Sequence, residues 1–475
     1  MSTLTMKGGT VRKLLALVLA LLIVGCSGGS GNSGGGSSSG GSSGGSSGGG
    51  TCCGNQVPVA TNSGPNVEPL VIDSGPAAAM GTAVNQPFVT VTVCANNNPA
   101  SCAAIDHVVV DTGSSGLRVV ADGIPNALLV ALQATYVKDP AVPANVLSEC
   151  IQFAGAYSYG TVALADIKQF STSTESATGL NVQIIGDPKY TTVPATCSTP
   201  PGVSPAPMQQ DTVATFGANG ILGVGIFQND CPACQSNNPP SGAYYSCATP
   251  TTCTDITTHA LPTQVVQNPV VMFPAIAPAT TADSNGTIMQ LPAISNAGVT
   301  NPGPTTGVIV FGIGTRSNNA LGSATVMAIN PIGATGQPSV SAKVNGTAYN
   351  DSFIDSGTNF LGLSGPALPM SVALCTSGQT VFYCTSSTAS FTATLQGQAS
   401  NGMPTGPMAN ANFSIADANT LLPNNTTVTA VPSLGGPNGD PASVDFGLPF
   451  FFGRYIYTGI QGETVSGAST PFYAY

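Results

Sequence analysis

The sequence has little charge and few of the side chains that bind metals. Of its 475 residues, ten are Lys or Arg, twenty are Asp or Glu, two are His and none is Trp. Two histidines cannot build a metal site alone, and we interpret His107 as a strand residue whose imidazole has a local partner. With so few basic side chains, the folded body is expected to bind neither nucleic acid nor an anionic membrane surface.

The sequence also lacks the signatures of several large enzyme classes. It has no phosphate loop and no dinucleotide fingerprint, and no Gly-x-Ser-x-Gly elbow accompanies either His107 or His259. Long stretches of helical periodicity are absent as well. With 38 Pro and 58 Gly in the chain, helices are expected to be few and brief.

The first 25 residues have the pattern of a lipoprotein signal peptide. Basic residues precede an apolar run, residues 14–24, which is too short to span a bilayer. Residues 23–26, IVGC, fit a lipobox, so Cys26 is expected to be lipidated; an ordinary cleaved signal peptide is the alternative. Because Ser27 follows rather than Asp, we expect an exported protein anchored to the envelope through lipid, at the periplasmic face or cell surface of an outer membrane.

Residues 26–56 form the lipidated cysteine and a Gly/Ser-rich tether, which cannot bury apolar surface and has a random-coil reach of roughly 25–30 Å. From residue 57 onward, short runs of Val, Ile, Thr and Phe are broken by Gly, Pro and Asn, which predicts an all-β chain. This part is too long for one β core. We expect two similar lobes, residues 57–295 and 296–475, joined near residues 296–306.

Two stretches repeat one order of residues: apolar residues, Asp, a hydroxyl, Gly and a second hydroxyl. They are residues 108–117, VVVDTGSSGL, and residues 352–361, SFIDSGTNFL. Each predicts a strand that runs into a tight turn and presents its Asp at the strand end. The order Asp, hydroxyl, Gly occurs a third time as Asp-Ser-Gly at Asp73, but Pro76 follows it instead of a hydroxyl, and we interpret that copy as an ordinary turn.

If the two turns face each other, Asp111 and Asp355 come within hydrogen-bond reach. Like-charge repulsion then prevents both from ionising, so that the pair shares one proton and its two apparent pKa values separate. The ionised carboxyl can take a proton from water while the protonated one polarises a carbonyl. Such a pair can hydrolyse a peptide bond without a metal.

These motifs resemble the two active-site motifs of pepsin-like aspartic proteases. Three further segments resemble that family in the expected order: residues 219–225 and 446–457 resemble the apolar-apolar-Gly segments of the first and second lobes, and residues 307–314 the strand that opens the second half. The motif DTGSSGLR, the cysteine layout and the lipoprotein N-terminus also resemble a bacterial lipoprotein family of unknown function related to aspartic proteases.

The resemblance implies a bilobal pepsin-like fold with the active-site cleft between the lobes and with Asp111 and Asp355 as its catalytic pair. It also implies roles for the residues that follow each Asp. The inner hydroxyls would hold the two turns together, the glycines would let the backbone turn closely, and the outer hydroxyls would bond their own Asp. These supporting residues are Thr112, Gly113 and Ser114 in the first turn and Ser356, Gly357 and Thr358 in the second.

The chain departs from that family in two places. Pepsin-like enzymes close the cleft with a hairpin flap that carries a Tyr at its tip. Counting back from Asp166 puts Phe153 at the tip, whereas Tyr159 matches the family's letters but lies too close to Asp166; Tyr157 is the third candidate, and the register stays open. The second departure is Arg118, which replaces a Trp and could lower the pKa of a nearby carboxyl group.

The cysteines predict a disulfide framework. With Cys26 set aside, their number is even, as is typical of an exported protein with disulfides. The expected local pairs are Cys94 with Cys102, Cys150 with Cys197, and Cys375 with Cys384. A cluster of Cys231, Cys234, Cys247 and Cys253 allows three pairings. A redox or zinc motif is an alternative for CPAC at residues 231–234, but no βαβ pattern surrounds it. The partners of Cys52 and Cys53 stay open.

The sequence therefore predicts a membrane-tethered, exported aspartic endopeptidase that acts as a monomer on polypeptide substrates, with no metal and no other cofactor. The alternative is a non-catalytic surface or periplasmic binding lipoprotein that keeps the fold and binds peptide or glycan in the cleft. The lack of a flap Tyr and the presence of Arg118 favour the alternative. The complete set of Asp and hydroxyl residues favours the enzyme. A purely structural envelope lipoprotein would leave the paired motifs unexplained.

Overall fold

The computed structural model describes residues 63–475, apart from residues 154, 201–202, 204–205, 278, 297, 301–304, 332–337 and 424–426. The predicted signal peptide, Cys26, the tether, Cys52 and Cys53 lie outside the described residues. Within the described ranges, no helix is both long and apolar enough to cross a membrane.

Strands dominate the regular structure, which confirms the predicted all-β class. The helices are short, as expected for a chain so rich in Pro and Gly. They are α1 (Asn126–Gln133), α2 (Ala195–Ser198), α3 (Val213–Phe216), α4 (Ala418–Leu421) and the 3-10 turns η1 (Ala121–Gly123), η2 (Pro232–Gln235), η3 (Pro269–Met272) and η4 (Leu448–Phe450).

The first part of the chain folds into a closed barrel with added hairpin strands. Its strands are β2 (Phe88–Ala95), β3 (Cys102–Asp111), β4 (Ser115–Val120), β5 (Val146–Phe153), β6 (Ala156–Phe170), β7 (Ala177–Ile185), β8 (Met208–Gln209), β9 (Gly220–Val224), β10 (Tyr244–Thr249) and β11 (Thr252–Asp255). Strands β2, β3, β9, β4, β7 and β6 pair in that order, and pairing of β6 with β2 closes the ring. Closure leaves these six strands without a free edge inside the barrel.

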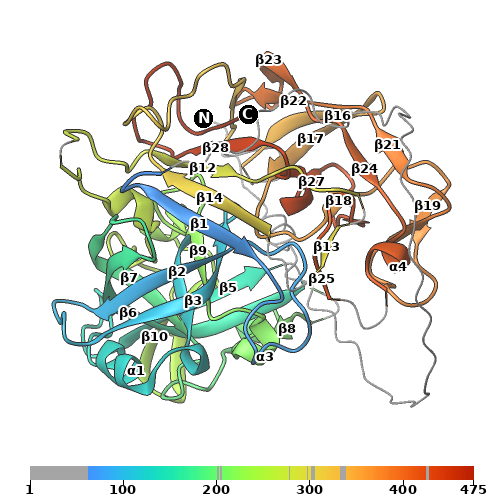
Figure 1. The fold of residues 1–475 in the computed structure, drawn as a ribbon. Helices are drawn as coiled ribbons and strands as arrows, with labels where there is room; N and C mark the ends of the chain where they lie inside the picture. The colour runs from blue at the N-terminus through green and yellow to red at the C-terminus, as the bar shows by residue number, and fades with distance from the viewer. Residues whose placement is uncertain are drawn as a thin grey trace, which may run out of the picture.

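The same sheet continues into a layer shared by both parts of the chain. The strands of this layer are β1 (Val67–Ile72), β12 (Gly286–Gln290), β14 (Thr305–Phe311), β15 (Val326–Ala328), β28 (Tyr455–Gly459) and β29 (Phe472–Ala474). They pair in the order β1-β14-β12-β28-β29-β15, so the beginning, middle and end of the described chain lie side by side (Figure 1). The predicted lobe junction, residues 296–306, follows β12 in the chain and ends at the start of β14, and these two strands pair with each other in this layer.

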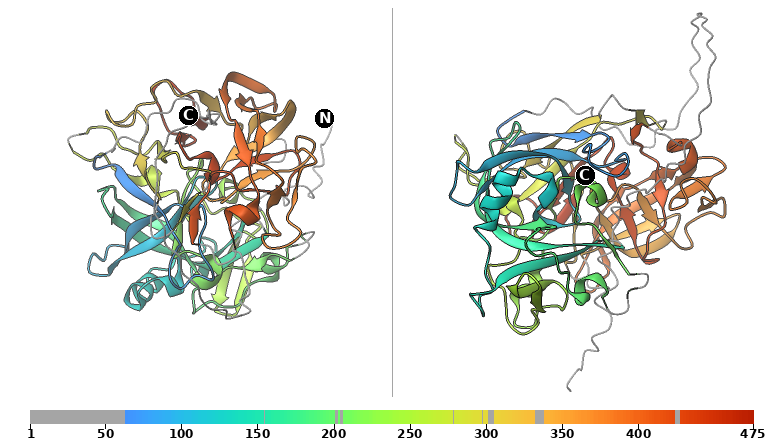
Figure 2. Two further views of the ribbon diagram at one scale, coloured as in Figure 1. Left: turned by 45° about the vertical axis from the view of Figure 1, so that its right-hand side comes forward. Right: turned by 90° about the horizontal axis from the view of Figure 1, so that it is seen from below.

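The second part of the chain forms a separate sheet of seven strands. They are β16 (Val340–Val344), β17 (Thr347–Ile354), β18 (Leu361–Leu363), β22 (Ala393–Gln398), β23 (Pro404–Asn410), β26 (Gly435–Gly436) and β27 (Val444–Phe446). Small two-stranded sheets pair β13 (Val299–Thr300) with β25 (Val428–Ala430), β19 (Val372–Leu374) with β20 (Tyr383–Thr385), and β21 (Ala389–Phe391) with β24 (Phe413–Ile415). Figure 2 shows the blue-green elements gathered on one side and the orange-red elements on the other.

One local arrangement occurs in both parts. Strand β9 lies between β3 and β4, parallel to the first and antiparallel to the second. Strand β27 lies between β17 and β18 in the same senses. In both cases the strand that leads to the predicted Asp is buried, with Val110 and Ile354 fully inaccessible to solvent. Each Asp therefore starts from a rigid, close-packed strand end.

Candidate active site

The first Asp turn follows directly from the end of β3. Asp111 is the last residue of this strand, and its carboxyl group accepts bonds from within its own turn. The backbone N–H of Gly113 donates to Asp111 Oδ1 at 2.7 Å, and the Ser114 hydroxyl donates to Oδ2 at 2.5 Å. Two donors from the same tight turn hold the carboxyl in one orientation.

The second Asp turn repeats this geometry at the end of β17. The Gly357 N–H donates to Asp355 Oδ1 at 2.8 Å, and the Thr358 hydroxyl donates to Oδ2 at 2.9 Å. Both outer hydroxyls thus bond to their own Asp, as the resemblance implies.

Hydroxyl groups join the two turns to each other. The N–H of Thr112 donates to Ser356 Oγ at 3.0 Å, and the N–H of Ser356 donates to Thr112 Oγ1 at 2.9 Å. The Ser356 hydroxyl donates in turn to the carbonyl of Val110 at 2.7 Å, and the Thr112 hydroxyl to that of Ile354 at 3.4 Å. These reciprocal bonds connect residues about half the chain apart, and each is worth about 0.5–1.5 kcal/mol net.

The two glycines bring the carboxyl groups together. A Cβ added to Gly113 would lie 2.5 Å from Asp355 Cγ, and one added to Gly357 would lie 2.6 Å from Asp111 Oδ1. Each turn therefore rests against the carboxyl group of the other, and a side chain at either glycine would displace it. Asp111 and Asp355 are 6% and 5% exposed, so both are largely withdrawn from water.

The electrostatics of the pair follow from this proximity. Burial first, and then the neighbouring carboxyl of Asp111, raise the pKa of Asp355 well above its ordinary value, while the bonds from Gly357 and Thr358 oppose the rise. When two carboxyls lie this close, like-charge repulsion favours one shared proton over two negative charges. The arrangement provides one acid and one base on the same centre.

The hairpin of β5 and β6 contains all three flap candidates. Phe153 pairs with Ala156 at its end, whereas Tyr157 and Tyr159 lie farther along β6, paired with Gln152 and Cys150. The Phe153 ring packs edge-on against Phe216, 6.1 Å between centroids. Both tyrosines are buried, and the Tyr159 hydroxyl lies 3.2 Å from Cys253 Sγ. The end of this hairpin therefore carries Phe153 and neither of the tyrosines.

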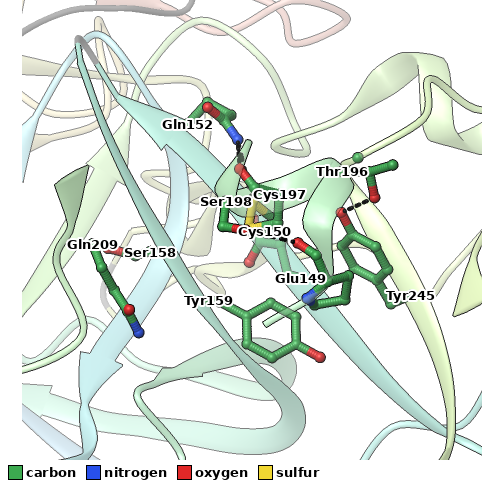
Figure 3. The surroundings of a disulfide bond; sticks show 12 residues. Glu149, Cys150, Gln152, Ser158, Tyr159, Thr196, Cys197, Ser198, Gln209 and Tyr245 are labelled. Atoms are coloured by element: carbon green, nitrogen blue, oxygen red, sulfur yellow. Dashed lines mark hydrogen bonds between the residues drawn. A yellow bond between two sulfur atoms is a disulfide. The ribbon is translucent and has the colours of Figure 1, made fainter. Parts of the chain in front are cut away.

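The hairpin is fastened on both sides. Figure 3 shows the Cys150–Cys197 disulfide beside the Tyr159 ring, with the amide of Gln152 donating to the Cys197 carbonyl at 2.8 Å. On the other side, β8 pairs in parallel with the start of β6. Covalent and backbone bonds thus limit how far the hairpin can move as a unit.

Arg118 lies on β4, seven residues after Asp111, and is fully buried. Its Nη1 donates to the Ser115 carbonyl at 3.0 Å, and its Nη2 lies 2.6 Å from Glu149 Oε1 and 3.5 Å from Asp230 Oδ2. Burial acts to lower the pKa of Arg118, but the two carboxyl groups outweigh it and the pKa is raised. Asp355 is not among these carboxyl groups. The guanidinium joins the strand after the Asp turn to the first strand of the hairpin.

Asp445 is a third buried carboxyl beside the dyad, and the sequence analysis missed it. It lies on β27 between Phe353 of β17 and Gly362 of β18, and it is 1% exposed. Burial, and then the charge of Asp355, raise the pKa of Asp445 well above its ordinary value. The sequence feature that could have identified it is an acid directly before Phe446 and Gly447. The matching position of the first part is the apolar residue Ile221.

The third Asp-Ser-Gly copy lies apart from the dyad. Asp73 accepts a bond from Gly75 N at 2.9 Å, and its Oδ2 lies 3.4 Å from Nε2 of His107. The other ring nitrogen of His107 faces Asp106 at 2.9 Å. A cavity of about 140 Å³ is lined by Asp73, His107 and Phe88 among others, and by neither dyad carboxyl.

Five disulfides confirm the predicted framework and resolve the open cluster. The structure forms Cys94–Cys102, Cys150–Cys197, Cys375–Cys384, Cys231–Cys234 and Cys247–Cys253. In the described residues, the only grouping with the spacing of a metal site is Cys375, Cys384 and Asp417, and its two sulfurs are bonded to each other. Sulfurs consumed in a disulfide are not available as thiolate ligands.

The molecule is thus an all-β protein in which two Asp turns are bonded face to face. Residues 62–475 match the model of a family described as "Protein of unknown function (DUF3443)", and the chain belongs to this family. No curated protein matches the chain. Among solved structures it is similar to "Crystal structure of Basic 7S globulin from soybean", at 11% identity over 86% of this chain and 94% of that chain, with a TM-score of 0.40. Neither match names a reaction, so the site alone carries the functional argument.

Proposed function

We propose that the protein is an aspartic endopeptidase with a pepsin-like two-Asp centre. The observation that supports this best is the reciprocal bonding of Thr112 and Ser356, which fastens the two turns so that each glycine lies against the opposite carboxyl. A pair of ordinary surface turns has no need of four cross-bonds in a buried position. Such rigidity is what a pair of carboxyls needs to share a proton.

The reaction follows from the charge state of the pair. A water between the carboxyls gives a proton to the ionised one as its oxygen attacks the scissile carbonyl carbon, while the protonated one donates to the carbonyl oxygen. The tetrahedral intermediate then collapses, the C–N bond breaks, and the amine leaves with a proton returned from the dyad. Because the proton belongs to the pair, neither Asp111 nor Asp355 has a permanent role as acid or base.

The test is cleavage of a peptide library by the soluble body, starting after the tether, between about pH 3 and pH 7. Asp111→Asn and Asp355→Asn should each abolish cleavage. The matched control is Asp73→Asn, which alters the same Asp-Ser-Gly triplet away from the dyad and should cleave as the parent does. Folded, disulfide-intact parent protein that cleaves nothing in this range would overturn the proposal.

A second candidate is a binding protein that keeps the site without turnover. It is favoured by the end of the β5–β6 hairpin, where Phe153 takes the place of a hydroxyl-bearing Tyr and packs on Phe216. Under this candidate the parent protein and Asp111→Asn would retain the same peptide or glycan ligands from a library, and neither would release cleavage products.

We further propose that the protein is exported and anchored through lipid on Cys26 to the outer membrane. Five disulfides support an oxidising compartment, because such bonds are rare in the cytosol. Metabolic labelling with a fatty acid should modify the parent chain and leave Cys26→Ala unlabelled. Equal labelling of both chains would contradict the anchor, and fractionation of the labelled parent with inner membranes would contradict its outer-membrane location.

A further inference from the structure

Asp445 is buried in a way that calls for an explanation. Its side chain lies between β17 and β18, the strands on either side of the second Asp turn. Neither of its oxygens meets ordinary hydrogen-bond geometry with a described residue, and Thr358 is the side chain near enough to act on the carboxyl as a hydrogen-bond partner. A Cβ added to Gly362 would come within 2.9 Å of Asp445 Cβ, so the neighbouring strand leaves room for this acid by carrying glycine.

The groups that act on Asp445 all belong to the dyad region. The carboxyls of Asp355 and Asp111 add to the effect of burial and raise the pKa of Asp445, the hydroxyl of Thr358 lowers it, and no cation is among these groups. Tyr473 on β29 is the other titratable group that senses this charge, and its hydroxyl lies against the backbone of Ile354. Because the dyad with its one proton carries one negative charge, an ionised Asp445 would add a second negative charge in a buried place with no positive partner. The neutral acid is the form that such surroundings stabilise.

Thr358 connects this acid to the dyad. A hydroxyl has one proton to donate and two lone pairs that accept. The Thr358 proton is already used, because it donates to Asp355 Oδ2 at 2.9 Å. Any bond between Thr358 and Asp445 must then run the other way, with the protonated acid as donor.

We propose that Asp445 is a positioning residue of the catalytic pair, a neutral acid that donates to Thr358 Oγ1 so that the hydroxyl donates more strongly to Asp355 Oδ2. This inference rests on the proposed peptidase function and deepens it. Hydrogen bonds in a chain polarise one another. The relay stabilises the ionised form of the pair, which is the form that takes a proton from water.

The strand pairing identifies the residue of the first half-site that corresponds to Asp445, and this residue suggests a test. Ile221 occupies the corresponding position on β9, paired with Val109 just as Asp445 is paired with Phe353. Asp445→Ile therefore copies the first half-site into the second and removes the donor. Asp445→Asn keeps a donor, since its amide N–H can bond to Thr358 Oγ1. Glu175→Gln is the control, because Glu175 is another fully buried acid, and the charged groups that act on it are Asp283 and Arg316 and not the dyad carboxyls.

We expect Asp445→Ile to move the acid limb of the kcat/KM profile to higher pH by about 0.5 unit or more, and to lower kcat. Asp445→Asn and Glu175→Gln should keep the parent's acid limb. Resistance to denaturant should stay the same or increase in Asp445→Ile, because removing a buried carboxyl group offsets the loss of its bond to Thr358. A merely structural role predicts the reverse: lower stability with an unchanged pH profile. That result would overturn the proposal, as would equal shifts in the Ile and Asn variants.

A second measurement separates this proposal from the peptidase proposal. Carboxyl carbons of Asp can be titrated by NMR in the folded protein without substrate, and Asp111→Asn and Asp355→Asn identify the dyad signals. Asp445→Ile should raise the lower of the two apparent pKa values of the pair. If the parent cleaves no peptide but this shift is seen, the peptidase proposal fails and the relay stands. If cleavage is seen without the shift, the relay fails alone.

Discussion

The two Asp half-sites have the same backbone and different buried ionisable groups. In the first, β9 brings Ile221 beside Arg118, the seventh residue after Asp111. In the second, β27 brings Asp445 beside Gly362, the seventh residue after Asp355. Arg118 of the first half-site thus corresponds in position to Gly362 of the second, and Ile221 corresponds to Asp445. The symmetry of the hydrogen bonds around the carboxyls does not extend to the next layer of side chains.

The surroundings of these two buried groups differ as well. Arg118 has two carboxyl neighbours, and Tyr244 donates to one of them, Asp230, at 2.8 Å. Asp445 has no cation beside it. One atom of each member of the Arg118 network also lacks a hydrogen-bond partner, but its charges are paired. A buried ion pair can rigidify a strand, whereas an acid without a cation costs stability and is retained for another reason. The comparison therefore suggests a structural role in the first half-site and an electrostatic one in the second.

The largest effect is expected where the half-sites touch. Gly113→Ala and Gly357→Ala each place a Cβ at under 3 Å from the opposite carboxyl, so both should lower peptidase activity about 100-fold or more by moving the pair apart. Gly439→Ala is the control, since nothing lies within 4 Å of its added Cβ. Peptide cleavage at the pH optimum checks this, and near-parental activity in either variant would contradict the geometry.

Removing Arg118 should have the next largest effect. Arg118→Met leaves the neighbouring carboxyls of Glu149 and Asp230 buried without a cation, and we expect a loss of about 3–5 kcal/mol in the free energy of unfolding at pH 7. The pKa of Asp230 is already raised by burial and by Glu149, so its folded form holds the proton more tightly than the unfolded chain. Stability from such an acid is present below the unfolded pKa and is lost as pH rises through the folded value. The loss should therefore be smaller at about pH 4.

Denaturant unfolding at both pH values measures this difference. The matched variant is Arg118→Met combined with Glu149→Gln and Asp230→Asn, in which the carboxyl charges are absent too. Its stability should recover part of the loss at neutral pH. An equal loss at the two pH values in Arg118→Met alone would show that packing, and not charge, explains the effect.

Removing the hydrogen bonds between the two turns should lower stability by a smaller amount, and the two turns should differ in how much they lose. Ser356→Ala removes an acceptor for Thr112 N and a donor to Val110 at 2.7 Å, whereas Thr112→Val removes an acceptor for Ser356 N and only a 3.4 Å bond to Ile354. Each should cost about 1–3 kcal/mol, with Ser356→Ala the more costly. Urea unfolding of both variants under one buffer checks the order, and the reverse order would indicate that the longer bond is the stronger one.

The smallest effect is expected at the third Asp-Ser-Gly copy. Its ion pair with His107 is partly exposed, so Asp73→Asn should change the free energy of unfolding by roughly 0.5 kcal/mol or less. Hydrogen bonding to His107 lowers the pKa of Asp73, and the same bond raises the pKa of His107. The contribution of Asp73 is present above its unfolded pKa and lost as pH falls through the folded one, while that of His107 is lost as pH rises. Thermal melts across pH should show a difference between the parent and Asp73→Asn only between the folded-state pKa of Asp73 and that of His107.

Much of this site could be predicted before the structure. The repeated order of Asp, hydroxyl, Gly and hydroxyl is local information, and it identified both carboxyls and all six supporting residues. The short-range disulfides were accessible for the same reason, because Cys94 and Cys102 are close in sequence. What could not be predicted was register: the same spacing argument left Phe153, Tyr157 and Tyr159 as alternatives, since hairpin pairing depends on cross-strand contacts that a single strand does not record.

The sequence by itself determined the all-β class, the paired Asp turns and the even set of cysteines, because each rests on residue types within a few positions of one another. Only the tertiary structure decided what surrounds the pair. It paired Arg118 with Glu149 and Asp230, and it brought Asp445 ninety residues along the chain to the side of Asp355. The physical reason is that burial and charge are properties of neighbours in space, and β pairing assembles those neighbours from distant segments.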